Sequence, residues 1–105
     1  MPMYNPAHPG ELIRETIEAL REETGKKLTI EEVASGLATT RKTLSSVING
    51  KQSISPEMAV KLATAFKNTT PEFWLSVQDN YDLARARKKV KTSRIKVFWR
   101  PAAAL

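Results

Sequence analysis

Apolar residues recur every three or four positions from residue 8 to residue 84, which is the period of an amphipathic helix. A capping residue, often followed by proline, precedes the periodic stretches, and glycine or asparagine follows several of them. The pattern predicts five short helices, which run from His8-Pro9 to Gly25, Thr29 to Leu37, Thr40 to Asn49-Gly50, Ser55-Pro56 to Asn68, and Thr70-Pro71 to between Ala84 and Lys88.

The period changes to two near the C-terminus. Between Arg94 and Arg100 the residues alternate, and Ile95, Val97 and Trp99 fall on one side of an extended chain. This alternation predicts a strand or an extended arm. Since one strand is not stable alone, it would pair with another strand, for instance its copy in a second subunit. We therefore expect an all-α fold with three parts, which are an N-terminal extension (1–7), a helical domain (8–84) and a basic C-terminal arm (85–105).

Composition narrows the possible chemistry. The 105 residues suffice for one domain. Cysteine is absent and His8 is the single histidine, which excludes disulfides, thiolate chemistry and a histidine-rich metal centre. We interpret His8 and Glu11 as a helix cap and a dipole-stabilising acid, and expect no catalytic residue, metal, cofactor or enzymatic activity. Neither a membrane span of ~20 apolar residues nor a signal-peptide pattern is seen, so we expect a cytoplasmic protein without a membrane partner.

Positive charge is concentrated at the C-terminus. The net charge is +6, yet residues 84–105 contain eight Lys and Arg and no acid, so the rest of the chain is slightly acidic. Such an arm favours a polyanion such as nucleic acid, with a solubilising tail as the alternative. The arm has three candidate roles: it could contact phosphates, add a strand to a partner protein, or close a dimer.

The second and third predicted helices have the features of a helix-turn-helix motif at about residues 29–50. Ala34 is small where the two helices would cross, and their inner faces are apolar. The outer face of the third helix is polar, and residues 38–52 contain no acid. Because acidic side chains repel DNA, this face favours duplex DNA over the alternative of a plain solvent-exposed surface.

A recognition helix presents its N-terminal residues to base edges in the major groove. Arg41 can contact guanine O6 and N7 together, Lys42 can reach guanine or a phosphate, and Thr43 can meet a thymine methyl or a base edge. The free N–H groups after Thr29 can receive another phosphate. The predicted DNA-binding residues are Thr29, Thr39, Thr40, Arg41, Lys42, Thr43, Ser45, Ser46, Asn49 and Lys51, of which the last four suit phosphates and sugars.

The segments 28–34 and 43–51 resemble the lambda-repressor-like (Xre-type) helix-turn-helix family. Three further segments resemble the HigA antitoxins, also called addiction-module antidotes or virulence-associated protein I; they are His8-Pro9-Gly10-Glu11-Leu12-Ile13, Ile54-Ser55-Pro56-Glu57-Met58-Ala59, and Thr70-Pro71-Glu72-Phe73-Trp74-Leu75 with Asn80-Tyr81-Asp82-Leu83. The resemblance, over residues 8–83, implies an antitoxin of a type II toxin–antitoxin system. Such a protein neutralises a HigB-like toxin, an mRNA endonuclease, and represses its own operon as a dimer. The alternative is a stand-alone Xre-type transcriptional regulator without a toxin.

Two features depart from the family pattern. The turn between the two helices often has glycine followed by an aliphatic residue, and here Ala38 and Thr39 occupy these positions. Since an alanine with positive φ costs about 1 kcal/mol or more, we expect a turn of somewhat different geometry. The basic arm lies outside the matched segments, and its charge argues against docking on a basic toxin because like charges repel.

The fifth predicted helix places Phe73, Trp74, Val77 and Tyr81 at helical spacing. We interpret them as core and dimer surface rather than as a ligand site. Aromatic residues are enriched at interface cores, so we expect an isologous homodimer through this helix. Its two recognition helices could read half-sites about one DNA turn apart, ~34–36 Å.

Overall fold

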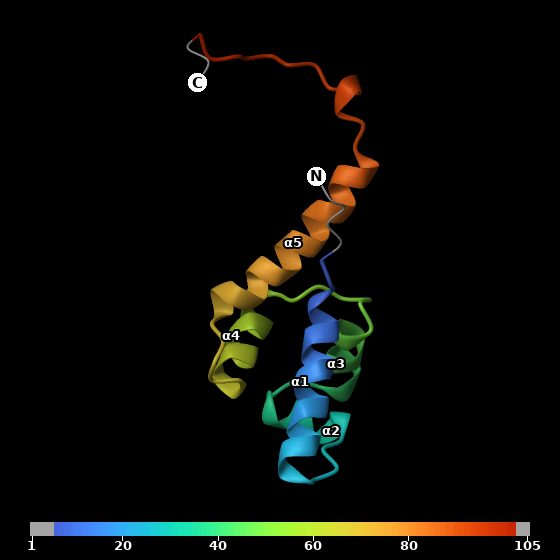
Figure 1. The fold of residues 1–105 in the computed structure, drawn as a ribbon, viewed down its shortest axis with the longest axis vertical. Helices are drawn as coiled ribbons and strands as arrows, with labels where there is room; N and C mark the ends of the chain where they lie inside the picture. The colour runs from blue at the N-terminus through green and yellow to red at the C-terminus, as the bar shows by residue number, and fades with distance from the viewer. Residues whose placement is uncertain (1–5, 103–105) are drawn as a thin grey trace.

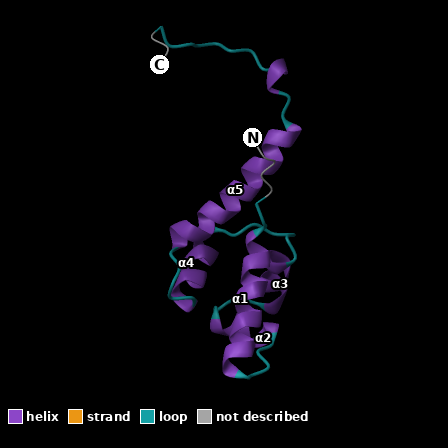
Figure 2. Ribbon diagram, viewed as in Figure 1, coloured by secondary structure: helices purple, strands orange, loops and turns teal. Residues whose placement is uncertain are grey.

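The computed structural model describes residues 6–102, which form helices joined by short turns and end in an extended C-terminal segment (Figures 1 and 2). These residues contain no strand. The prediction of an all-α fold with five helices is confirmed. The helices are α1 (Pro9–Thr24), α2 (Ile30–Gly36), α3 (Arg41–Ile48), α4 (Pro56–Ala65) and α5 (Pro71–Lys89), followed by a single 3-10 turn, η1 (Thr92–Arg94).

A side chain caps the start of each of these α-helices. Thr29, Thr40, Ser55 and Thr70 each accept a hydrogen bond from the backbone N–H three residues further on. His8 caps α1, because its Nδ1 accepts a hydrogen bond of 2.9 Å from the N–H of Gly10. The capping residues therefore lie where the sequence pattern places the helix starts.

One hydrophobic core fixes α3 in place. α3 packs against both α1 and α2, while α5 packs against α4 and α1. Ile13 of α1, Leu44 and Val47 of α3, and Leu62 of α4 are all fully buried in this core. The inner side of α3 is thus held by neighbours, which leaves its opposite side turned outward.

Gly10 lets the first turn of α1 approach the last turn of α3. A Cβ atom at Gly10 would lie 2.2 Å from the carbonyl oxygen of Val47 and 2.5 Å from that of Ile48. Because no side chain fits in this space, the close approach requires glycine. Gly36 at the end of α2 differs, since a Cβ atom there would have no neighbour within 4 Å.

The prediction of a C-terminal strand is wrong for the described residues. The chain from Ile95 to Arg100 has no strand partner, and Phe98 and Trp99 are 88% and 78% exposed. A strand needs a neighbour to hydrogen-bond with its backbone, and the residues 6–102 supply none there. The segment instead forms the extended arm that was the alternative prediction, and it projects away from the helices in Figure 1. α5 continues to Lys89, so the first residues of the arm are helical, and their cations suit the helix C-terminus.

Candidate nucleic-acid interface

The turn between α2 and α3 keeps the left-handed residue that we expected it to avoid. Ala38 has a φ of 55°, and the N–H groups of Ala38 and Thr39 donate to the carbonyls of Ser35 and Ala34 at 3.0 and 2.9 Å. The Nζ atom of Lys61 in α4 donates to the carbonyl of Ala38 at 2.9 Å. The expectation of a different geometry is therefore wrong, because these bonds and the packing of both helices hold alanine in a conformation that glycine would adopt more easily.

The outward side of α3 is the polar surface that the sequence predicts. Leu44, Val47 and Ile48 point into the core, whereas Arg41 and Lys42 are exposed at the helix start. Thr39, Thr43, Ser45 and Ser46 are half-buried, and Thr40, Asn49 and Lys51 are exposed. The structure thus brings the predicted residues from 39 to 51 together on and beside one helix.

Arg41 has an acidic neighbour that lies outside the acid-free segment. Its Nε atom is 3.8 Å from a carboxylate oxygen of Glu31, and both side chains are largely exposed. Glu31 belongs to the first turn of α2, so only the crossing of the two helices brings it beside α3. An exposed ion pair contributes about 0–1 kcal/mol, which leaves Arg41 free to exchange this partner for another.

The end of α3 is tied to α1 through a residue that the sequence did not single out. Arg14 donates from Nη2 to Oδ1 of Asn49 at 3.0 Å, and Asn49 donates from Nδ2 to Oγ of Ser45 at 3.3 Å. Asn49 and Ser45 therefore belong to a surface network as well as to the predicted phosphate-binding set. Arg14 adds a cation to this surface, and its position in α1, sixteen residues before the start of α2, gave no local signal.

The polar groups of Thr29 form hydrogen bonds within the first turn of α2. Its Oγ1 accepts from the N–H of Glu32, and its own N–H donates to Oε1 of Glu32, each at 3.1 Å. This capping box satisfies two of the N–H groups at the start of α2, and Glu31 and Glu32 place two acids there. Local charge and hydrogen bonding therefore argue against the phosphate site that we predicted at Thr29.

A polar hollow of about 320 Å³ connects the end of α3 to α5. Lys51, Arg85 and Lys89 line it together with His8 and Asp82. Burial lowers the pKa of His8 below its ordinary value of 6.5, although the charges of Asp82 and Glu11 partly oppose this effect. Neutral His8 matches its role as a cap, because Nδ1 must be unprotonated to accept a hydrogen bond.

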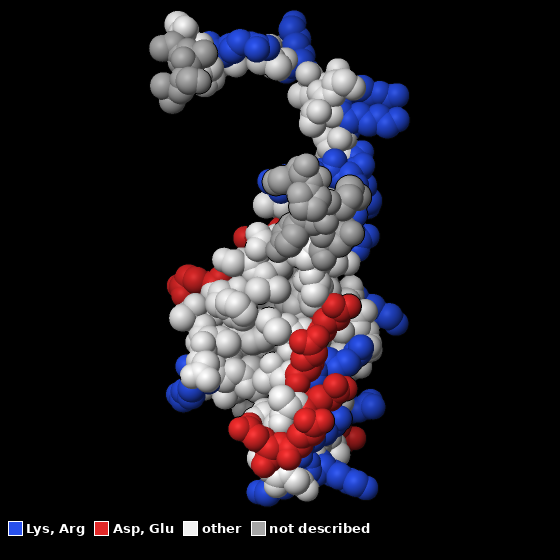
Figure 3. Space-filling view, in the orientation of Figure 1, with Lys and Arg blue, Asp and Glu red and all other residues white. Residues whose placement is uncertain are grey.

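The charges are separated over the surface. Most Lys and Arg side chains in Figure 3 line the right-hand edge, on the side where Figure 1 places α2 and α3, and continue along the arm. Acidic side chains gather on the face over α1, whose exposed acids are Glu11, Glu15, Glu18, Glu22 and Glu23. A polyanion would therefore meet the α3 edge in preference to the α1 face.

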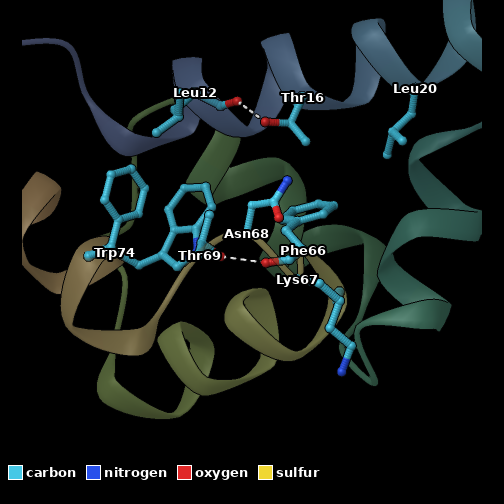
Figure 4. Close-up of a pocket in the computed structure, with 10 residues that line it drawn as sticks. Leu12, Thr16, Leu20, Phe66, Lys67, Asn68, Thr69 and Trp74 are labelled. Carbon is cyan, nitrogen blue, oxygen red and sulfur yellow. Dashed lines mark hydrogen bonds between the residues drawn. The ribbon is translucent and has the colours of Figure 1, made fainter.

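A second hollow, of about 410 Å³, is mainly apolar and lies between α1 and the turn from α4 to α5 (Figure 4). Leu12, Thr16 and Leu20 of α1 face Phe66 and Trp74 across it. The indole N–H of Trp74 donates to Oγ1 of Thr69 at 2.9 Å. With few charged groups around it, this hollow lacks the donors that a nucleic acid backbone requires.

The four residues predicted for a dimer interface divide into two groups. Trp74 is 1% exposed and belongs to the core, so its assignment to an interface is wrong. Phe73 is 41% exposed, and Val77 and Tyr81 are half-buried. Tyr81 packs edge-to-face against His8, with ring centroids 4.8 Å apart. The sequence pattern could not separate these residues, because helical spacing does not show where α4 covers α5.

Two kinds of site are absent from residues 6–102. No helix in this range combines the length and hydropathy needed to cross a membrane. Nor do these residues bring three or more His, Asp or Glu side chains together in an arrangement that could hold a metal ion.

Comparison with known proteins identifies the family. A helix-turn-helix family model (HTH_3) matches residues 17–74. Virulence-associated protein A' of Dichelobacter nodosus is 42% identical over 100 residues, which cover 95% of this chain and 81% of that protein. The uncharacterized HTH-type transcriptional regulator YddM of Escherichia coli K12 is 32% identical over 96 residues, covering 91% of this chain and 95% of that protein.

Solved structures agree with these relatives. An addiction module antidote protein of the HigA family from Coxiella burnetii superimposes with a TM-score of 0.76 at 32% identity, over 90% of this chain and all of that one. The antitoxin HigA of Pseudomonas aeruginosa, solved with the higBA promoter, gives 0.70 at 26% identity over the same shares. The family consists of DNA-binding regulators and antitoxins rather than enzymes. The chain therefore belongs to the HTH_3 (Xre-like) helix-turn-helix family, among structural neighbours that are HigA-type antitoxins.

Proposed function

We propose that this protein is a HigA-type antitoxin that binds operator DNA through α3, represses its own operon and neutralises a HigB-like toxin. The observation that carries the DNA-binding part is the outward side of α3, where the polar residues from 39 to 51, none of them acidic, form one surface above the buried side of the helix. The promoter bound by the Pseudomonas aeruginosa HigA supports the same role for this chain.

Arg41 is the residue that we assign to base recognition. It lies at the start of α3, the end of a recognition helix that meets base edges. A bidentate contact to guanine is worth about 1–3 kcal/mol of discrimination, whereas the exposed pair with Glu31 is worth at most about 1 kcal/mol. Guanine should therefore displace Glu31 from Arg41. Lys42 and Thr43 would read or flank the neighbouring bases.

A dimer would place two such helices on one duplex. We assign its interface to the exposed side of α5, where Phe73 and Val77 remain accessible. One domain has few base contacts, so pairing two half-sites supplies the affinity that a repressor needs. Sedimentation at micromolar concentration tests this step, and a monomer under those conditions would remove it.

A stand-alone transcriptional regulator is the second candidate. Its support is the similarity to YddM, a protein named as an HTH-type transcriptional regulator. The two candidates share the DNA surface and differ only in the toxin. Co-expression with the neighbouring reading frame and purification of the complex separates them, because an antitoxin retains a small partner protein through purification and a stand-alone regulator does not.

The test of the DNA surface compares two variants, each of which replaces one cationic residue with alanine. A preferred duplex is first selected from a random library with the wild-type protein. Arg41→Ala should lose about 1–3 kcal/mol on this duplex, roughly 5- to 150-fold, and much less on random DNA. Lys67→Ala, an exposed cation beside the apolar hollow, should leave both affinities nearly unchanged. An equal loss on both duplexes for Arg41→Ala would reduce Arg41 to a phosphate contact, and the absence of any selected sequence would refute the proposed function.

A further inference from the structure

The arm offers cations that the helical domain does not use. Lys91, Arg94, Lys96 and Arg100 are all exposed, and the last acid before them in the sequence is Asp82. Water hydrates each of these cations, but like charges close together on one short segment also repel one another. Its charge is best complemented by a row of anions.

The start of the arm lies beside the end of the recognition helix. Arg85 and Lys89 of α5 line the same hollow as Lys51, which directly follows α3. Figure 3 shows the basic edge continuing from the helical domain along the arm. A ligand that follows this edge from α3 would therefore meet the arm next.

The extended course of the arm after η1 places Lys96 and Arg100 opposite most of its apolar residues. In an extended chain alternate residues point to opposite sides, so Lys96 and Arg100 share one side with Phe98, and Ile95, Val97 and Trp99 share the other. The Nζ atom of Lys96 lies 5.3 Å from the centroid of the Phe98 ring. The eleven steps from Lys89 to Arg100 can span at most about 36 Å, which is close to one turn of duplex DNA, ~34 Å.

From this juxtaposition we propose that residues 85–100 bind the sugar-phosphate backbone of the duplex beside the segment that α3 reads. The proposal rests on the proposed DNA binding and extends its footprint. The cationic side of the arm faces the phosphates, and the contact does not depend on base sequence because phosphates are the same at every step. Affinity for any duplex should then depend steeply on salt.

The salt dependence of binding to a random 30-bp duplex tests this directly. One variant changes Lys91, Arg94, Lys96 and Arg100 to Gln, and its matched control changes Ile95 and Val97 to Ser, which keeps the length and the charge of the arm. Each lost phosphate contact should reduce the slope of log affinity against log salt by about 0.9. Four lost contacts should therefore reduce the slope by about 3.6. Between 50 and 200 mM salt, the wild type should then lose about 150-fold more affinity than the four-glutamine variant loses. The control should keep the wild-type slope.

Fluorescence of Trp99 gives a second, independent measurement. Trp99 is 78% exposed and Trp74 only 1%, so acrylamide quenching reports on the arm. Adding the random duplex should shield Trp99 in the wild type and not in the four-glutamine variant. Shielding that appears without DNA and grows with protein concentration would overturn the proposal in favour of pairing between arms of two copies.

The outcomes separate this inference from the proposed function. An unchanged slope in the four-glutamine variant overturns the role of the arm, even if Arg41→Ala still abolishes preference for the selected duplex. A changed slope together with loss of preference in Arg41→Ala supports both. A changed slope with no selected sequence at all supports backbone binding by the arm and refutes operator recognition by α3.

Discussion

Replacing Gly10 with alanine should destabilise the fold by separating α1 from α3. The new Cβ atom would lie 2.2 Å and 2.5 Å from the carbonyl oxygens of Val47 and Ile48, and 2.8 Å from the carbonyl carbon of Ile48. These are backbone atoms, so no rotamer change relieves the overlap, and the helices must move apart by about 1 Å to restore contact distances near 3.3 Å. Overpacking of this kind costs about 3 kcal/mol, and the better helix propensity of alanine returns about 1 kcal/mol.

The expected net loss is thus about 2 kcal/mol, or a fall of about 8–16 °C in the midpoint of thermal unfolding followed by circular dichroism at 222 nm. Gly36→Ala is the matched control, because nothing lies within 4 Å of its added methyl group; it should be neutral or raise the midpoint by up to about 8 °C. If Gly10→Ala were as stable as the wild type, α1 could not lie as close to α3 as the structure shows, and the reasoning would be refuted.

Three further predictions concern single residues. Ala38→Gly should stabilise the protein by about 0.5–1 kcal/mol in urea unfolding, because relief of the left-handed alanine exceeds the entropy that glycine adds to the unfolded chain; a loss of stability would contradict this. The lowered pKa of His8 means that the unfolded state binds its proton more tightly, so stability should fall as the pH drops below 6.5 until the folded-state pKa is passed. His8→Asn, which keeps a capping acceptor, should lack this dependence between pH 7.5 and 5.5, and an identical dependence would assign it to other groups. Glu31→Gln should raise affinity for the selected duplex by up to about five-fold, since it frees Arg41; weaker binding would instead show that Glu31 orients Arg41.

Local signals were enough to predict the helices and one side of the DNA surface. Caps such as Thr40 and Thr70 act within three residues of their own position, so the sequence displays them directly. The buried side of α3 follows from spacing alone, because Leu44, Val47 and Ile48 recur with the helical period.

Contacts between distant segments could not be predicted in this way. The pair between Glu31 and Arg41 depends on how α2 crosses α3, and the left-handed conformation of Ala38 is supported by Lys61, 23 residues away. Alternation from residue 94 to 100 indicates which side chains share a side, but it contains no information on whether a partner strand is available. Helical spacing likewise does not show which residues other helices cover, so the buried Trp74 and the exposed Phe73 were assigned to the same predicted interface.

The separation of the acidic face of α1 from the basic edge and the basic arm gives the molecule an uneven charge distribution and hence an electric dipole. In the field of a polyanion, a dipole is rotated before any contact is made, so collisions in the wrong orientation are corrected during approach. The protein would thus arrive at a duplex with the basic edge leading, and its rate of encounter should fall steeply as salt screens the field.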